Sequence, residues 1–157
     1  SVAPWSERLK AGRKVYLALC DGEFSGTHVV RAPVGRVMRS GGKTQPAIVP
    51  HGKDAHSTLR ALETRQGRTL VAAEIHTGRT HQIRLHLAHL GHPLVGESMH
   101  REPASELLPY PALHSWCLEL ALNQDAPLRV EAPLPSEFRR TLTSMGFALP
   151  NKAEVGF

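Results

Sequence analysis

Cysteine, long apolar runs and a signal peptide are scarce or absent in this sequence. The 157 residues include only two cysteines, Cys20 and Cys117, in separate apolar strand-like segments. This spacing indicates buried thiols in a reducing compartment rather than a disulfide framework. No apolar run approaches the roughly 20 residues that a helix needs to span a bilayer, so we expect a soluble protein with no membrane partner.

The start of the chain carries neither a methionine nor the apolar segment of a signal peptide. We therefore expect a processed chain or a piece of a longer protein. The expected location is the cytoplasm of a bacterium, which we prefer. An RNA-containing organelle or the nucleus is the expectation for a eukaryote.

The composition is that of a basic globular protein. The chain is long enough for one domain with a buried core, 41% of its residues are hydrophobic, and 12 prolines with 13 glycines imply many turns. The net charge is +5 and arginine dominates the basic residues. Guanidinium groups match the geometry of phosphates, so the charge favours a nucleic-acid partner, although ordinary solvated surface is the alternative.

Strands outnumber helices in the pattern, and they follow one another in pairs. The expected strands of the first half are 14–20 and two extended pieces within 27–39. A loop is expected at 40–50 and a hairpin at about 56–76, whose first part, 56–66, could instead be a short helix. In the second half we expect a loop at 98–111, paired strands at 113–122 and 128–131, and a final helix from Pro135 to Gly146.

These elements predict an α+β fold, with a mixed, largely antiparallel sheet and two helices packed on it. Residues 1–13 are expected to be an irregular lead-in, 14–148 the domain, and 149–157 a tail without periodicity.

The segment 76–97 concentrates functional side chains beside clear structural signals. Ile83, Leu87 and Leu90 have the spacing of a helix that faces the sheet, and Thr77 or Thr80 could cap its start. Gly91 and Pro93 would end the helix. Arg84 follows Ile83 and is rotated by about 100° from the buried stripe, so we expect a rigidly held cation at the edge of a cleft.

Five histidines in the same segment allow a zinc site as an alternative interpretation. His86 and His89 are three residues apart on one helical face. No thiolate pair or His-Glu-x-x-His pattern accompanies them, so the sequence supplies no defined ligand set. We predict no metal, and phosphate contacts or structural hydrogen bonds for these histidines.

The segment Thr77-Gly-Arg-Thr-His-Gln-Ile-Arg-Leu-His-Leu87, followed by Gly91-His-Pro-Leu-Val-Gly96, resembles a signature of the RluA-type pseudouridine synthases. Four further motifs, in the family's order, resemble it as well: Lys14-Val-Tyr-Leu-Ala18, Gly52-Lys-Asp-Ala55, Leu113-His-Ser115 and Ala132-Pro-Leu-Pro-Ser-Glu-Phe138. Together the motifs span roughly residues 12–140, so the resemblance is far more specific than one short pattern.

The resemblance implies an RNA-modifying isomerase that converts uridine to pseudouridine in ribosomal or transfer RNA. In this family an aspartate is the nucleophile, a tyrosine stacks on the extruded base, and a basic residue pairs with the aspartate. The last two correspond to Tyr16 and Arg84. The RNA-binding residues that we predict are Arg79, Thr80, His81, Gln82 and His86. No cofactor is implied, because the isomerisation is redox-neutral and needs only acid–base steps.

Two departures from the family pattern stand out. The family's aspartate lies in a His-Arg-Leu-Asp motif before the tyrosine strand, and Asp21, Asp54 and Asp125 match no such pattern. After Gly96 the family continues with aspartate, whereas this chain has Glu97. We therefore expect the C-terminal part of a synthase whose nucleophile lies on another segment, with the 157-residue chain alone inactive. The alternative is a non-catalytic RNA-binding module.

Overall fold

The computed structural model describes residues 4–105, 107–121 and 126–157. The helices and strands are, in chain order, α1 (Trp5–Ala11), β1 (Arg13–Asp21), β2 (Thr27–Val30), β3 (Val34–Met38), the 3-10 helix η1 (Ser40–Gly42), β4 (Thr44–Ile48), β5 (Ser57–Arg65), β6 (Arg68–Ile75), α2 (Gln82–His89), β7 (Leu113–Ala121), β8 (Pro127–Glu131), α3 (Ser136–Ser144) and the 3-10 helix η2 (Lys152–Val155).

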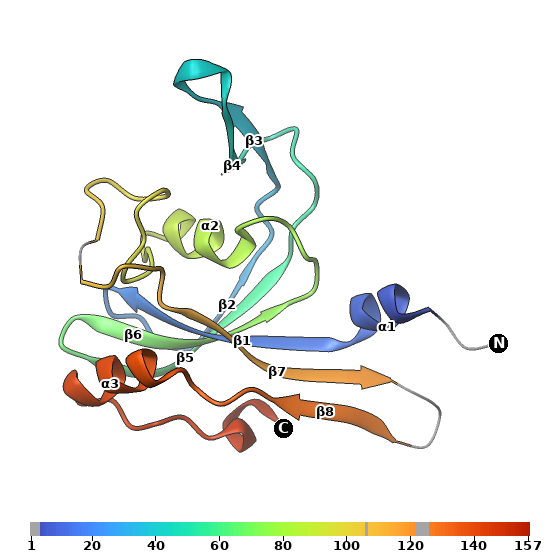
Figure 1. Cartoon of the computed structure of the whole chain (residues 1–157), viewed down its shortest axis with the longest axis vertical. Helices are drawn as coiled ribbons and strands as arrows, with labels where there is room; N and C mark the ends of the chain where they lie inside the picture. The colour runs from blue at the N-terminus through green and yellow to red at the C-terminus, as the bar shows by residue number, and fades with distance from the viewer. Residues whose placement is uncertain (1–3, 106, 122–125) are drawn as a thin grey trace.

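Six strands form one sheet in the order β2-β5-β6-β1-β7-β8, and its named strand pairs are all antiparallel. Helix α2 covers one face of this sheet, while α3 and the C-terminal segment cover the other (Figure 1). The predicted α+β class with a largely antiparallel sheet is confirmed. In the part of the chain that the structure describes, no helix is long and apolar enough to cross a membrane.

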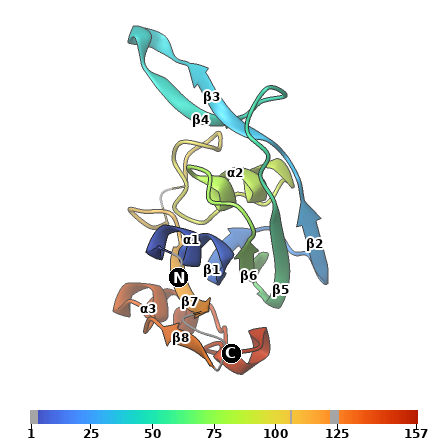
Figure 2. The ribbon, with the colours of Figure 1, turned by 90° about the vertical axis from the view of Figure 1, so that its right-hand side faces the viewer.

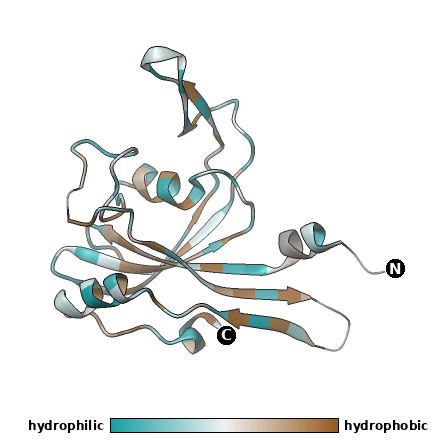
Figure 3. Ribbon diagram, in the orientation of Figure 1, coloured by the Kyte–Doolittle hydropathy of each residue, from teal (hydrophilic) through white to brown (hydrophobic). Residues whose placement is uncertain are grey.

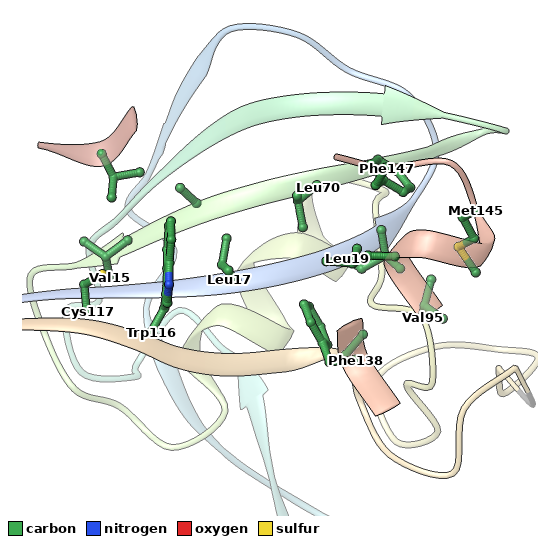
Figure 4. Packing of buried hydrophobic residues seen from close by; sticks show 14 residues of the cluster. Val15, Leu17, Leu19, Leu70, Val95, Trp116, Cys117, Phe138, Met145 and Phe147 are labelled. Atoms are coloured by element: carbon green, nitrogen blue, oxygen red, sulfur yellow. The ribbon is translucent and has the colours of Figure 1, made fainter. Parts of the chain in front are cut away.

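The central strand β1 shows how the sequence produces this layered arrangement. Alternate side chains of a strand point to opposite faces of its sheet. Val15, Leu17 and Leu19 join the core on the α3 side, which Figure 4 shows with Phe138 and Trp116. The residues that alternate with these, Tyr16, Ala18 and Cys20, pack on the α2 side. They belong to the cluster that holds Ile83 and Leu87. Helix α3 is hydrophilic over most of its length (Figure 3), and it buries Phe138 and Leu142.

The predicted loop at 40–50 is wrong, because most of it belongs to a hairpin. Strands β3 and β4 pair over five positions and project from the body of the molecule (Figures 1 and 2). Pro46 and the pair Gly41-Gly42 suggested a loop, but a two-stranded ribbon has two edges, and proline is tolerated on an edge. The two glycines form the turn at its tip, both with positive φ. We call this projection the β3–β4 arm.

Two further expectations needed correction. The lead-in is not irregular in its described part, because residues 5–11 form α1 and β1 already begins at Arg13. The tail from Pro150 contains η2, whose Val155 is buried in the core on the α3 side. The ambiguous segment 56–66 is a strand, and it completes the predicted hairpin with β6.

The other predicted elements are confirmed. Four predicted features begin and end within a few residues of the expected positions. They are the tyrosine-bearing strand β1, the pair β7–β8, the helix α2 and the closing helix α3. Residues 122–125, which include the end of the predicted strand 113–122, lie outside the described residues. Cys20 and Cys117 are buried and free, as expected.

Candidate active site on helix α2

Helix α2 is a rigid mount because one side of it is buried in the sheet core. Ile83 is 4% exposed and Leu87 is fully buried. At its end, Gly91 adopts φ +85°, the left-handed conformation that terminates helices. Leu90, the third residue of the predicted stripe, is half-buried and packs against the same cluster.

The start of α2 differs from the predicted threonine cap. The residue before the helix is His81, with φ 57° and no side-chain capping bond. Gln82 organises the turn instead, because its Oε1 accepts hydrogen bonds from Thr77 Oγ1 (2.7 Å) and from the backbone N–H of Arg79 (3.0 Å). Its Nε2 donates to the carbonyl of His56 and to Ser57 Oγ. Left-handed non-glycine residues cost free energy, and the described residues contain two of them, Gln66 in the β5–β6 turn and His81 at the start of α2.

Arg84 is paired with the most deeply buried carboxylate among the ion pairs of the described residues. Its Nε donates to Glu97 Oε1 at 2.8 Å and its Nη2 to Glu97 Oε2 at 2.7 Å, a bidentate ion pair. The Arg84 side chain is 18% exposed and the Glu97 side chain is fully buried. Bidentate pairs fix the plane of the guanidinium group as well as its position. The expected rigid arginine is therefore present, but a carboxylate of this chain already occupies two of its donors.

Glu97 is also bound by backbone amides. Its Oε2 accepts hydrogen bonds from the N–H groups of Ser98 (3.0 Å) and Met99 (3.1 Å). Burial by itself raises the pKa of Glu97. The hydrogen bonds from Arg84 and from the Met99 amide outweigh burial and lower the pKa to about 2. Glu97 is therefore ionised at neutral pH and holds the side chain of Arg84 in one orientation.

A pair of histidines adjoins the ion pair. Arg84 Nη1 lies 3.2 Å from His81 Nε2, and His81 Nδ1 lies 2.9 Å from His100 Nε2. Arginine can only donate, so His81 Nε2 accepts and its Nδ1–H donates to His100. Burial and the positive charge of Arg84 lower the pKa of both histidines, which keeps them neutral at neutral pH.

His86 and Gln82, two of the predicted RNA-binding residues, are buried. His86 Nε2 donates to the Ala32 carbonyl and its Nδ1 accepts from Ser57 Oγ, both at 2.9 Å. Burial lowers the pKa of His86, so the ring is neutral. In this structure both side chains hold α2 to the sheet, and their contact with RNA stays a prediction.

Tyr16, Arg79 and Thr80 remain accessible. Tyr16 is half-buried on β1 and packs on the α2 side of the sheet, the same side as Arg84. Arg79 and Thr80 precede the helix and line a cavity at the base of the β3–β4 arm. Neither Tyr16 nor Arg84 lines that cavity.

The family model of the RNA pseudouridylate synthases matches residues 7–89, which is more than half of the chain. The chain belongs to this family. It is 36% identical over 142 residues to the ribosomal large subunit pseudouridine synthase D of Nitrosomonas europaea, covering 85% of this chain and 41% of that protein. It is 37% identical over 145 residues to the protein of the same name from Pseudomonas aeruginosa, covering 80% and 43%.

A solved structure shares the fold. Human RNA pseudouridylate synthase domain containing 1 matches with a TM-score of 0.71 at 26% identity, over 83% of this chain and 57% of that one. The resemblance to RluA-type synthases predicted from the motifs is confirmed. The chain spans about two fifths of the length of the curated synthases it matches.

The aspartates that the structure describes do not pair with Arg84. Asp21 is bound by Arg68 and Arg101, and Asp54 is exposed in the loop before β5. Asp125 lies outside the described residues. Neither Asp21 nor Asp54 pairs with Arg84.

Sequence reasoning missed two members of the site, Glu97 and His100. Glu97 stands where the family continues with aspartate, so a carboxylate is retained at that position. A signal was therefore present in the sequence, because an acidic residue directly after the Gly91–Gly96 motif could have been paired with the nearest conspicuous arginine. Nothing in the sequence connects His100 with His81, since the segment after Gly96 that carries His100 has no regular spacing.

The five histidines of 76–92 do not assemble into a ligand set. Among the described residues, no three histidine, cysteine, aspartate or glutamate side chains gather closely enough to hold a metal ion. His56 and His76 stack at 4.2 Å between ring centroids, and His86 is held by Ser57 and Ala32. The histidines therefore serve several separate local structures.

Proposed function

We propose that this chain is the C-terminal part of an RNA pseudouridine synthase that isomerises uridine in ribosomal or transfer RNA. Membership of the family supports the reaction class. Two relatives are named as synthases of the ribosomal large subunit, which favours ribosomal RNA over transfer RNA. The observation that carries the proposal is the fixed guanidinium of Arg84 on α2, on the same side of the sheet as Tyr16.

The reaction breaks the bond between the ribose and a ring nitrogen and rejoins the ribose to a ring carbon. It needs an ionised carboxylate in a pocket with little water, beside a cation that keeps the carboxylate charged. Glu97 already binds Nε and Nη2 of Arg84, and His81 Nε2 accepts one Nη1 hydrogen, so we assign the second Nη1 hydrogen to the incoming carboxylate. Tyr16 is assigned to stack on the extruded base, which every enzyme acting on a base inside folded RNA must receive.

The nucleophile is assigned to a segment outside residues 1–157. Glu97 cannot take this role because its carboxylate is fully buried and occupied by Arg84 and backbone amides. Asp21 is bound by two arginines. The longer protein would therefore place the aspartate of the His-Arg-Leu-Asp motif beside Nη1 of Arg84, the nitrogen that Glu97 does not bind.

One observation favours a second candidate, a non-catalytic RNA-binding module. Arg84 already has a carboxylate partner in this chain, so the ion pair is stable without a nucleophile. A module that had lost catalysis could keep this arrangement as a structural feature. The synthase needs an upstream segment that supplies the nucleophile, whereas the binding module needs none.

The deciding experiment measures pseudouridine in a ribosomal RNA transcript after incubation with the 157-residue chain and with the protein extended by its upstream coding segment. We expect no product from the chain and product from the extended protein. Product from the chain alone would refute the external nucleophile. RNA binding without product from the extended protein would favour the binding module.

A further inference from the structure

A cavity of about 350 Å³ lies at the base of the β3–β4 arm. Three separate segments line it: residues 34–36 at the start of β3, residues 51–53 after β4, and residues 78–80 before α2. We call it the arm-base cavity. The segments that line it lie on the α2 side of the sheet, and α3 lies on the opposite side (Figure 1).

The lining of the arm-base cavity is basic. It includes Arg36, Lys53, Arg79 and His51, and no carboxylate lines it. Across residues 4–105, 107–121 and 126–157, none of the three cations Arg36, Lys53 and Arg79 forms an ion pair. Asp54 interacts with Arg79 through its backbone carbonyl, which accepts a hydrogen bond from Arg79 Nε at 2.8 Å. Three cationic residues therefore line one hollow, and none of the three forms an ion pair in the described part of the chain.

The cavity walls are held in place by backbone contacts. Val34 and Lys53 exchange two backbone hydrogen bonds of 2.9 Å, which hold the Lys53 loop against the arm. A side chain at Gly52 would meet the backbone of Val34 at 2.6 Å, so only glycine permits this approach. Arg36 is oriented by Thr44, to which its Nε and Nη2 donate. The backbone of the lining is therefore fixed, and hydrogen bonds orient the side chains of Arg36 and Arg79.

We propose that the arm-base cavity binds a backbone phosphate of the RNA. The inference rests on the proposed function only in that the ligand is RNA. Guanidinium and ammonium groups that line one cavity without a carboxylate match a phosphodiester anion. Arg79 precedes Arg84 in the same segment. A phosphate held there would fix the RNA strand beside the residues that handle the base.

The test titrates a labelled single-stranded RNA into the 157-residue chain at several salt concentrations. The double variant Lys53→Ala/Arg79→Ala removes two cavity charges. The matched control, Arg139→Ala/Arg140→Ala, removes two exposed charges from α3 on the opposite face. For single strands, the slope of log K against log salt should fall by about 0.7 in the cavity variant, the change expected when one phosphate contact is lost. The control should leave the slope nearly unchanged.

A cavity-filling variant tests the same site without changing charge. A side chain at Gly78 meets open space, and this residue has no positive φ, so Gly78→Val should fold. It should weaken RNA binding while the unfolding temperature is retained. Inorganic phosphate is the second ligand to be titrated, and binding as strong as that of RNA would refute the assignment to RNA.

Equal slopes for the cavity variant and the α3 control would overturn the cavity as a binding site. That result would leave the proposed function intact if the extended protein still formed pseudouridine. A cavity-dependent slope without any pseudouridine from the extended protein would support the site and refute the synthase.

Discussion

Arg84 and Glu97 lie thirteen positions apart, and their side chains form a buried pair with two hydrogen bonds of 2.8 and 2.7 Å. The helix α2 carries the arginine, and the turn after Gly96 carries the glutamate. The pair ties the end of the Gly91–Gly96 motif to the start of the helix, so two motifs of the family signature act as one structural unit. Two predictions follow from this pair, one for each partner.

Glu97→Gln should destabilise the chain at neutral pH by roughly 3 kcal/mol, because it removes the charge that compensates a largely buried guanidinium. The pKa of Glu97 is lowered from 4.5 to about 2. The folded protein therefore binds this proton less readily than the unfolded one, and the stability is present above about pH 4.5 and lost as the pH falls toward 2. Urea unfolding at pH 7 and pH 3 measures the difference.

The difference between wild type and Glu97→Gln should shrink at pH 3. The control Glu119→Gln breaks the exposed pair with Arg129 and should cost less than about 1 kcal/mol. A Glu97→Gln variant as stable as this control would show that the buried pair contributes no special stability.

Arg84→Ala, in the extended protein, should reduce pseudouridine formation by on the order of a hundredfold or more while RNA affinity is nearly retained. The incoming carboxylate would lose its cation, and Glu97 would be left without its main partner. Arg84→Lys is the matched variant, because it keeps the charge and loses the bidentate geometry. Single-turnover rates and RNA dissociation constants are the measurements. Unchanged turnover in Arg84→Ala would refute the role assigned to this residue.

Tyr16→Phe should separate stacking from proton transfer. The phenyl ring keeps the aromatic surface, whereas the hydroxyl is lost. If Tyr16 acts only as a platform, the rate of the extended protein should change by less than about threefold, and a loss of two orders of magnitude or more would indicate proton transfer. Tyr16→Leu completes the series and should weaken the reaction in either case.

Ser57→Ala should destabilise the fold by about 1–3 kcal/mol, because Nδ1 of the buried His86 loses its donor. The pKa of His86 is lowered, so the stability that its neutral form contributes is full above about pH 6.5 and is lost as the pH falls below it. Chemical unfolding between pH 5 and 8 measures both effects. Ser144→Ala on the exposed end of α3 is the control and should stay within about 0.5 kcal/mol.

Period-two and helical patterns predicted the sheet strands and α2 because burial on one face determines them. The alternation along β1 and the spacing of Ile83 and Leu87 reflect which side chains leave water, and that selection acts directly on the sequence. The order of the motifs along the chain predicted the family. The β3–β4 arm escaped prediction because it is a two-stranded ribbon with little buried surface, so proline and glycine were tolerated in and beside its strands.

The site was predictable only in part because its contacts join distant segments. Arg84 could be placed at a helix edge from its offset to Ile83. Its partner Glu97 lies in a loop with no regular spacing, and the hydrogen bonds that bury it depend on the turn at Gly96. The same limit applies to the arm-base cavity, whose cations come from three segments that approach one another only after folding.

The place of β1 at the centre of the sheet constrains the order of folding. This strand precedes both of its neighbours, β6 and β7, in the sequence, and the latter begins only at Leu113. The hairpin β5–β6 closes a short loop and needs no distant partner, so it should form first, with β1 and then β7 joining it. Pulse-labelled hydrogen exchange should protect the β5–β6 amides before those shared by β1 and β7. Until β7 arrives, one edge of the central strand β1 stays unpaired, so nascent or truncated chains would be prone to intermolecular β pairing.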